Sequence, residues 1–402
     1  MLLLDELPRP ETWEAFYQYK IGLTCPKEET TALRDYIDRR AWLPVCERIG
    51  RGEAFPLPRR AVITKLYSEK KRIVYIYPEP ENTLLKLLTW LLLRRYDGLF
   101  SPGLYSFRPG RTAKDAIRAL RAVPGLGAMY AYKADISNYF NSIDVRRFLP
   151  ELGELLSDDP SLASFLSGLL AEPRVLERGK ELAEQKGIMA GTPLSAFYAN
   201  LYLRALDQAF AEQGIPYARY SDDIILFAPT EAETQQYAAR LRAFLSARGL
   251  RLNPSKECFF SPESGWTFLG FCCRGDRIDI APATMDKLKA KMRRKTRALA
   301  RWRDRSGHSG IQAATAFIRV FNRKLLETPT GSELSWSSWF FSVLTTTDSL
   351  HVIDRYAQDC LRGLMSGKRT KARYNVRYAD LKAIGYRSLV HAYYKYNKNK
   401  TS

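Results

Sequence analysis

Histidine is scarce in this sequence, and cysteine pairs and long apolar runs are missing. Three histidines in 402 residues are too few to favour a zinc site or a His-based hydrolytic triad. The six cysteines form no CxxC pair and no secreted-type framework, so we expect reduced thiols and a cytoplasmic protein. The longest apolar run, Leu84–Leu93, contains Lys86 and is too short to span a bilayer. The N-terminal residues also lack the features of a signal peptide.

Basic residues are in large excess. The chain has 63 Lys and Arg against 43 Asp and Glu, which gives a net charge of +20. The hydrophobic fraction of 46% is that of a folded protein, and the length predicts two to four domains. A charge excess of this size indicates a polyanionic partner, and nucleic acid is the first candidate.

Hydrophobic periodicity predicts strands interspersed with helices. We expect a helical segment over the first 65 residues, followed by strands over 72–77 and 130–137. Helices are expected over 83–97, 192–213 and 230–248, and hairpins over 218–227 and 267–281, the second turning at Gly275 and Asp276. This mixture predicts an α+β or α/β core.

Positive charge is concentrated in residues 286–305, which we expect to be helical. This segment holds ten basic side chains opposed only by Asp286 and Asp304, so i,i+4 acidic partners are missing. The basic residues are Lys287, Lys289, Lys291, Arg293, Arg294, Lys295, Arg297, Arg301, Arg303 and Arg305. The tail after residue 361 is again basic and carries six interleaved tyrosines. Both patterns favour contacts with phosphates and with stacked bases.

Two separated acidic positions lie in strand contexts. Asp135 ends an apolar strand, where a carboxylate is costly unless it is compensated, and Asp222 and Asp223 sit at the turn of a predicted hairpin. Neighbouring carboxylates repel each other less when they share a divalent cation. The acids from these strand ends are therefore candidate ligands of the two metal ions that support phosphoryl transfer.

Six ordered motifs over roughly residues 70–275 resemble those of reverse transcriptases, most closely the bacterial enzymes related to group II intron proteins. Tyr220–Asp223 (YSDD) looks like the YxDD box of that family, and Lys133–Ile143 (KADISNYFNSI) looks like its first aspartate motif. The remaining four are Gly187–Leu203, Tyr105–Arg111 (YSFRPGR), Leu252–Lys256 (LNPSK) and Thr267–Phe271 (TFLGF).

The resemblance implies a metal site. Asp135 and Asp222 would ligate two Mg²⁺ ions, with Mn²⁺ as a substitute. Asp223 would support the site, and the backbone carbonyl of Ile136 would complete a metal shell.

The resemblance also implies nucleotide-binding residues. Phe140 would be the steric gate that excludes a ribose 2′-OH, and Arg72 would grip the incoming triphosphate. Arg108 would contact template or nucleotide, and Lys256 would protonate the pyrophosphate. Ala190 stands where group II intron enzymes carry a Gln that helps to place the sugar, so nucleotide discrimination or processivity is expected to differ here.

A right-hand polymerase fold follows from the resemblance. It implies an N-terminal helical extension over 1–65, fingers and palm over 66–275, a thumb over 276–330 and a basic RNA-binding extension over 331–402. The expected partners are a non-coding RNA template, dNTPs and the cDNA product, without a membrane. The oligomeric state, including a homo-oligomer, is left open.

Three functions remain in competition. The first is an RNA-directed DNA polymerase acting in antiphage defence, because the C-terminal residues Tyr386–Tyr394 look like the tails of defence-associated enzymes. The second is a domesticated group II intron-like polymerase in repair or mobility. The third is an RNA-binding maturase or scaffold with an inactive core, and the intact Asp135, Asp222 and Asp223 argue against it.

Overall fold

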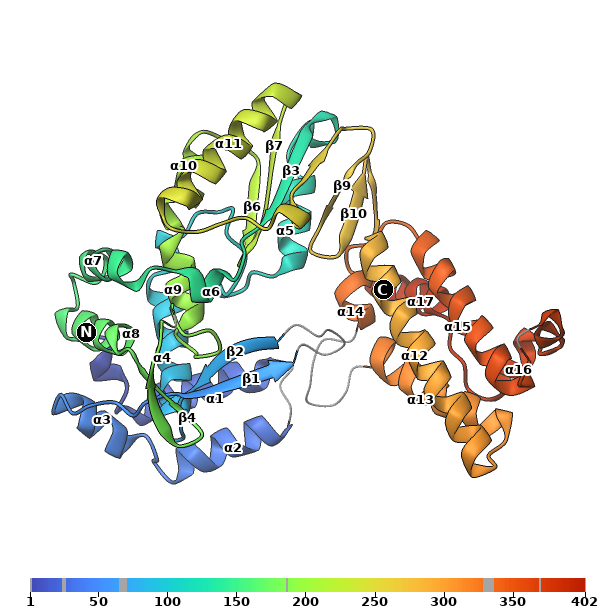
Figure 1. Cartoon of the computed structure of the whole chain (residues 1–402), viewed down its shortest axis with the longest axis horizontal. Helices are drawn as coiled ribbons and strands as arrows, with labels where there is room; N and C mark the ends of the chain where they lie inside the picture. Colours follow the sequence, from blue (N-terminus) through green and yellow to red (C-terminus); the bar gives the residue numbers. More distant parts are fainter. Residues whose placement is uncertain are drawn as a thin grey trace. The chain divides into compact units, whose positions relative to one another are not determined.

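Two compact units make up the chain in the computed structural model, Met1–Ser261 and Pro262–Ser402 (Figure 1). The structure describes residues 2–23, 27–64, 71–185, 187–327, 336–368 and 370–401. Cys25 and the segment 65–70 lie outside these residues, and the other five cysteines are free thiols. The domain boundaries expected from the sequence stay predictions.

Three helices open the first unit: α1 (Pro10–Gly22), α2 (Lys27–Asp38) and α3 (Leu43–Gly50). Trp13 is fully buried, and its ring stacks on Trp42 at a centroid distance of 5.1 Å. The Trp13 indole N–H also donates to the Leu7 carbonyl over 2.8 Å. Truncating a buried ring of this kind costs about 3–5 kcal/mol, so the aromatic residues fix the helices to one another. The predicted helical segment is confirmed as far as Gly50.

A four-stranded sheet with the order β2-β1-β4-β5 follows the helices. Its strands are β1 (Arg59–Thr64), β2 (Lys71–Ile76), β4 (Arg174–Glu177) and β5 (Lys180–Ala183). Strand β2 was predicted, whereas β1 lies inside the segment expected to be helical, so that expectation is wrong there. The predicted helix α4 (Glu81–Arg95) is confirmed and has eight buried residues, because it packs against both α1 and α9 (Ser195–Tyr202).

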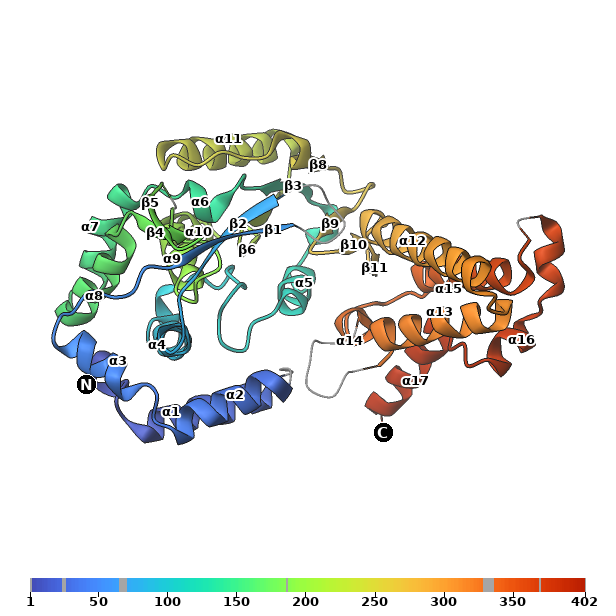
Figure 2. The same cartoon turned by 60° about the horizontal axis from the view of Figure 1, so that its bottom comes forward.

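The second sheet has the order β6-β7-β3-β8. Its strands are β3 (Tyr130–Asp135), β6 (Tyr217–Tyr220), β7 (Asp223–Ala228) and β8 (Cys258–Phe260). Helix α11 (Glu231–Ala247) packs on β3 and β7, and α5 (Ala113–Arg121) packs on β6 from the other side (Figure 2). The predicted strand, hairpin and helix of this region are confirmed.

The expected helix over 192–213 is two helices, α9 and α10 (Arg204–Glu212). The break falls at Leu203, which has φ −106° and ψ 11°, so the prediction of one continuous helix is wrong. Apolar residues continue across the break, and periodicity therefore did not reveal it. Three further helices of this unit are α6 (Tyr139–Ser142), α7 (Val145–Leu155) and α8 (Pro160–Ala171).

A small antiparallel sheet, β11-β10-β9, opens the second unit. It consists of β9 (Trp266–Phe268), β10 (Phe271–Arg274) and β11 (Arg277–Ile280). The turn predicted at Gly275 and Asp276 is confirmed, because Arg274 pairs with Arg277 across it. Gly275 has φ +53°, a conformation that favours glycine.

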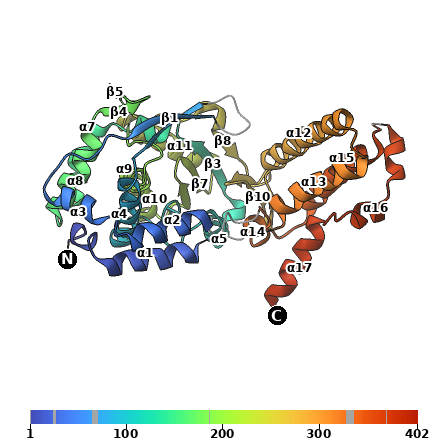
Figure 3. The ribbon, with the colours of Figure 1, turned by 90° about the horizontal axis from the view of Figure 1, so that it is seen from below.

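Helices make up the rest of the second unit. They are α12 (Pro282–Ser306), α13 (Gly310–Leu325), α14 (Trp336–Phe341), α15 (Asp348–Ser366), α16 (Tyr378–Ala383) and α17 (Leu389–Thr401). The first two and α15 pack side by side (Figure 3). Met292 and Leu299 are the buried residues of α12, so most of this basic helix faces outward. No helix in the described ranges is long and apolar enough to cross a membrane.

Candidate active site

Asp135 and Asp223 are directly opposite each other on the adjacent antiparallel strands β3 and β7. Side chains at such paired positions lie on the same face of a sheet, with Cβ atoms about 4.5–5.5 Å apart. The Ile136 N–H donates to the Asp222 carbonyl over 2.9 Å and continues the pairing into the turn. The strand register therefore brings together all three predicted aspartates and Ile136.

The hairpin that carries Asp222 has a two-residue loop, because Tyr220 pairs with Asp223. Ser221, the first loop residue, is buried and has φ +59°, a value that residues other than glycine rarely adopt. Its N–H donates to Ser106 Oγ over 2.8 Å, and its carbonyl accepts from Arg219 over 3.2 Å. These contacts offset the backbone strain and fix where Asp222 emerges.

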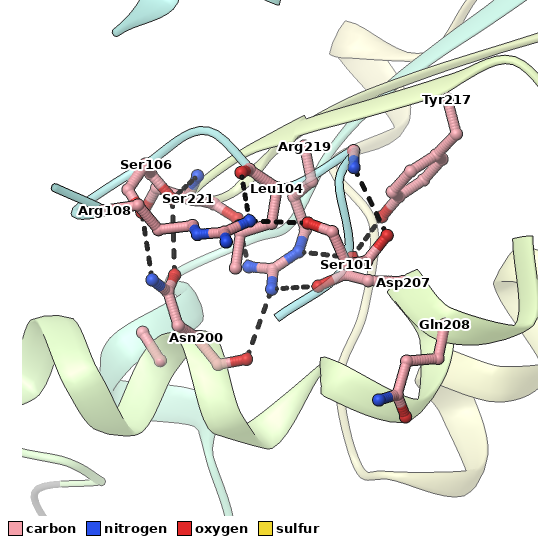
Figure 4. A network of polar contacts seen from close by, with 12 residues as sticks. Ser101, Leu104, Ser106, Arg108, Asn200, Asp207, Gln208, Tyr217, Arg219 and Ser221 are labelled. Carbon is pink, nitrogen blue, oxygen red and sulfur yellow. Dashed lines mark hydrogen bonds and ion pairs between the residues drawn. The ribbon is translucent and has the colours of Figure 1, made fainter. Parts of the chain in front are cut away.

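A buried polar network lies directly under this turn (Figure 4). Arg219 and Asp207 are both fully buried and form a bidentate ion pair with distances of 2.8 and 2.5 Å. Tyr217 donates its hydroxyl to Asp207 over 2.7 Å, and Arg219 reaches the Asn200 carbonyl over 3.3 Å. Breaking such a pair costs about 3–5 kcal/mol, because one charge is left buried alone. The network thus ties β6 to α9 and α10.

The charges of the three aspartates act on one another. Burial, followed by Asp222 and Asp135, raises the pKa of Asp223 from 3.8 to about 6. Lys133 and Lys256 oppose this rise. Lys256 contacts the site directly, since its Nζ lies 2.6 Å from Asp135 Oδ2. The site is therefore a concentration of negative charge that nearby cations balance only in part.

Phe140 belongs to the short helix α6, which follows Asp135 closely in the chain. Asn138 precedes this helix with φ +48° and turns the chain back. Tyr139 anchors it, because its buried hydroxyl donates to the Ala199 carbonyl over 2.5 Å. The Phe140 ring is half-buried and makes edge-to-face contacts with Tyr139 and Phe107.

The segment that contains Ala190 is packed between Phe140 and strand β2. The Ile188 N–H donates to the Phe140 carbonyl over 3.0 Å, and the Ala190 carbonyl accepts from Tyr75 N–H over 2.8 Å. A Cβ on Gly187 would lie 2.2 Å from the Phe140 carbonyl oxygen, so only glycine fits. The predicted residues Phe140 and Ala190 are thus joined through one tightly packed segment.

A family model described as "Reverse transcriptase (RNA-dependent DNA polymerase)" matches residues 68–273, which is half of the chain and includes this site. The chain belongs to the reverse transcriptase family. The predicted family resemblance is therefore confirmed, and the mixed α+β architecture agrees with the predicted right-hand polymerase fold.

Several known proteins are similar to this reverse transcriptase. "Retron Ec86 reverse transcriptase" of Escherichia coli is 24% identical over 228 residues, which cover 56% of this chain and 65% of that protein. "Group II intron-encoded protein LtrA" of Lactococcus lactis subsp. cremoris is 27% identical over 175 residues, which cover 43% of this chain and 29% of that protein. The match therefore spans less than two thirds of either relative.

Among solved structures, a telomerase from Candida albicans in complex with a fragment of telomeric RNA is similar with a TM-score of 0.44 and 11% identity. That similarity covers 83% of this chain and 66% of the telomerase. An apo telomerase from Candida tropicalis has a TM-score of 0.45 and 10% identity, covering 84% of this chain and 68% of that one.

Arg72 and Arg108 lie apart from the aspartates in this reverse transcriptase. Arg72 is exposed on β2, opposite Ile63. Arg108 is 7% exposed, and its guanidinium makes five hydrogen bonds, to Asp97 and to the carbonyls of Asp97, Ser101 and Leu104. This placement does not support the predicted contact of Arg108 with template or nucleotide, because its donors are engaged within its own loop.

Sequence reasoning missed the residues that hold the site in place. Ser106, Asn200, Asp207 and Arg219 were not predicted, although they fix the turn that carries Asp222. One signal was present for Arg219, which lies inside an otherwise apolar strand and therefore needs a buried partner. Its partner Asp207 could not be identified, because twelve residues and the end of a helix separate the two in sequence.

The three aspartates fit a magnesium site in the chemistry of their oxygen donors. Within the described ranges, no group of three or more His, Cys, Asp or Glu side chains forms a ready metal cage. Mg²⁺, however, is usually held by one or two carboxylates together with substrate phosphates and water. The raised pKa of Asp223 also shows a repulsion that a bound cation would relieve.

Proposed function

We propose that this protein is an RNA-directed DNA polymerase that makes cDNA from dNTPs by two-metal phosphoryl transfer. The observation that carries the proposal is the placement of Asp135 and Asp223 as direct cross-strand partners, with Asp222 in the adjoining turn. These acids lie inside the region that matches the reverse transcriptase family. The whole protein's substrates and partners are part of the proposal.

Asp135 and Asp222 would hold two Mg²⁺ or Mn²⁺ ions, with support from Asp223 and the Ile136 carbonyl. When bound, the ions would stabilise charge on the attacking and leaving oxygens. The buried Arg219–Asp207 pair would keep the Asp222 turn in one position during this chemistry. Lys256 is half-exposed beside Asp135, and we propose that it donates a proton to the leaving pyrophosphate.

Nucleotide selection would rest on Phe140. Its ring is half-buried and packed against two other rings, and it lies five residues beyond Asp135. We propose that this ring would clash with a ribose 2′-OH and so favour deoxynucleotides. Ala190 has no side-chain amide with which to place the sugar, and Arg72 remains the proposed triphosphate contact.

The test is a primer-extension assay on an RNA template with dNTPs and Mg²⁺. Replacing both acids, Asp222→Asn with Asp223→Asn, should lower the rate at least about a thousandfold, because the metal ligands are lost. The melting temperature of the double variant should not fall. Chelation of the wild-type protein should abolish extension, and added Mg²⁺ or Mn²⁺ should restore it. Extension by the double variant at more than about a tenth of the wild-type rate would show that the metal site is wrongly assigned.

We further propose that the natural template is a structured non-coding RNA bound in the cytoplasm, and that its copying acts against bacteriophage. The exposed cations of α12 support an RNA partner. Trp302 adds an aromatic face among them, since it is 39% exposed and stacks on His308 at 3.9 Å.

Two measurements test this wider proposal. Sequencing the RNA that copurifies with the protein should return one enriched RNA, and the cDNA should match it. Phage plaque counts should fall with the wild type and not with the Asp222→Asn, Asp223→Asn double variant. Equal plaque counts would reject the defence role, and enrichment of intron RNA would favour the group II intron-like alternative.

A further inference from the structure

Phe107 has an unusual backbone for an aromatic residue. It lies in the loop Tyr105–Arg111 and has φ +57°, in the left-handed region. Its side chain is also 41% exposed. A bulky residue at positive φ is a genuine outlier and persists only where its surroundings impose the conformation.

The residues on both sides of Phe107 are locked in place. Ser106 is fully buried, its Oγ accepts from Ser221 N–H over 2.8 Å, and its carbonyl accepts from the Asn200 side chain over 2.9 Å. Arg108 is held by its five hydrogen bonds within the loop. Both neighbours therefore fix the backbone, while the ring between them stays at the surface.

The ring of Phe107 lies against Phe140. Their centroids are 6.4 Å apart with an interplanar angle of 87°, which is the favoured edge-to-face arrangement. Tyr139 contacts the Phe140 ring as well, with a centroid distance of 5.6 Å and an angle of 71°. Tyr139 is its neighbour in the same helix, so Phe107 is the contact that comes from a different part of the chain.

We propose that Phe107 is a positioning residue that holds the Phe140 ring and thereby sets the discrimination between deoxyribonucleotides and ribonucleotides. This inference rests on the proposed function. A gate excludes a hydroxyl group only if its ring cannot turn aside, and an edge-to-face partner on a locked loop restricts such turning. Because Ser106 also holds Ser221, the same loop ties the gate to the turn that carries Asp222.

The test compares kcat/KM for a dNTP and the matching rNTP in single-nucleotide extension on RNA. Phe107→Asn and Phe107→Gly remove the ring and tolerate positive φ, so the fold should keep its melting temperature. Both should lower the dNTP preference by about tenfold, mainly by reducing the KM for the rNTP. Phe107→Tyr keeps the ring and should retain the wild-type preference.

A double-variant comparison shows whether Phe107 acts through Phe140. Phe140→Val alone should lose the preference, and adding Phe107→Asn should lower it no further. An unchanged preference in Phe107→Asn, or additive losses in the double variant, would overturn the inference. An equal loss of dNTP and rNTP use together with a lower melting temperature would assign Phe107 a purely structural role. If the wild type incorporates neither nucleotide, the proposed polymerase function itself fails.

Discussion

Asp223 illustrates how one residue serves the site at the expense of stability. Its pKa is raised to about 6 by burial and by Asp222 and Asp135, so the folded protein binds this proton more tightly than the unfolded chain does. Folding therefore loses free energy as the pH rises from about 4 to about 6, and the loss persists above that range.

Asp223→Asn should consequently raise the free energy of unfolding at pH 7.5 by about 1–3 kcal/mol, with little change near pH 4. Chemical denaturation of wild type and variant at both pH values measures this difference. Asp158→Asn is a control of opposite sign, because a hydrogen bond from exposed Arg95 lowers the pKa of Asp158. That variant should lose no more than about 1 kcal/mol at pH 7.5. An Asp223→Asn protein less stable than wild type at pH 7.5 would contradict the inferred repulsion.

Residue patterns in the sequence predicted the aspartates but not their supports. Asp135, Asp222 and Asp223 follow from motifs and strand ends, and the observed register brings them together. The positive φ of Ser221 and Phe107 could not be predicted, because both conformations are imposed by distant residues such as Asn200 and Arg108. Such supports depend on tertiary contacts that no local pattern records.

At the scale of elements, strand and helix patterns succeeded where one face is buried. Strands β2, β3 and β7 and helices α4 and α11 lie where the sequence placed them. Strand β1 was missed, because the segment before it is helical and its partner β4 is more than a hundred residues away. Local propensity does not reveal a pairing of that range.

The C-terminal helix α17 shows how buried polar contacts replace a simple apolar face. The buried carboxylate of Asp354 accepts hydrogen bonds from the Tyr386 hydroxyl, the Ser388 hydroxyl and the N–H groups of Leu389 and Val390, at 2.6–3.1 Å. Tyr386 and Tyr393 are also buried, so these two tail tyrosines belong to the core.

Asp354→Ala should destabilise the second unit by about 2–4 kcal/mol, because several buried donors lose their acceptor. Amide hydrogen exchange over α17 should accelerate, while exchange over the sheet β6-β7-β3-β8 stays unchanged. Asp359→Asn on the same helix is a matched control, since its side chain is 41% exposed and should shift stability by less than about 1 kcal/mol. Unchanged protection of α17 in Asp354→Ala would show that apolar packing alone holds this helix.

At the scale of the whole molecule, the net charge of +20 is expressed most strongly on one helix. The α12 segment places seven exposed cations along its length: Lys287, Lys291, Arg293, Arg294, Arg297, Arg301 and Arg305. In the tail, Tyr374, Tyr378 and Tyr394 are exposed. Deleting the chain after Gly367 would remove the buried Leu389 as well as these rings, so point substitutions are the sharper probe of RNA binding.

Replacing Arg293, Arg294 and Arg297 with Gln should weaken binding of every RNA and lower the slope of log K against log salt by about 2–3 units, because each lost phosphate contact releases about one counterion fewer. Substituting Tyr374, Tyr378 and Tyr394 with Leu should instead reduce the preference for the copurifying RNA over a scrambled one. Filter binding across a salt series measures both quantities. The control replaces Arg39, Arg51 and Arg118 with Gln, which removes the same charge from the helices of the first unit and should leave the slope unchanged. If the control lowers the slope as much as the α12 variant does, net charge rather than α12 governs the binding, and an unchanged slope in both would leave α12 as a solvated helix.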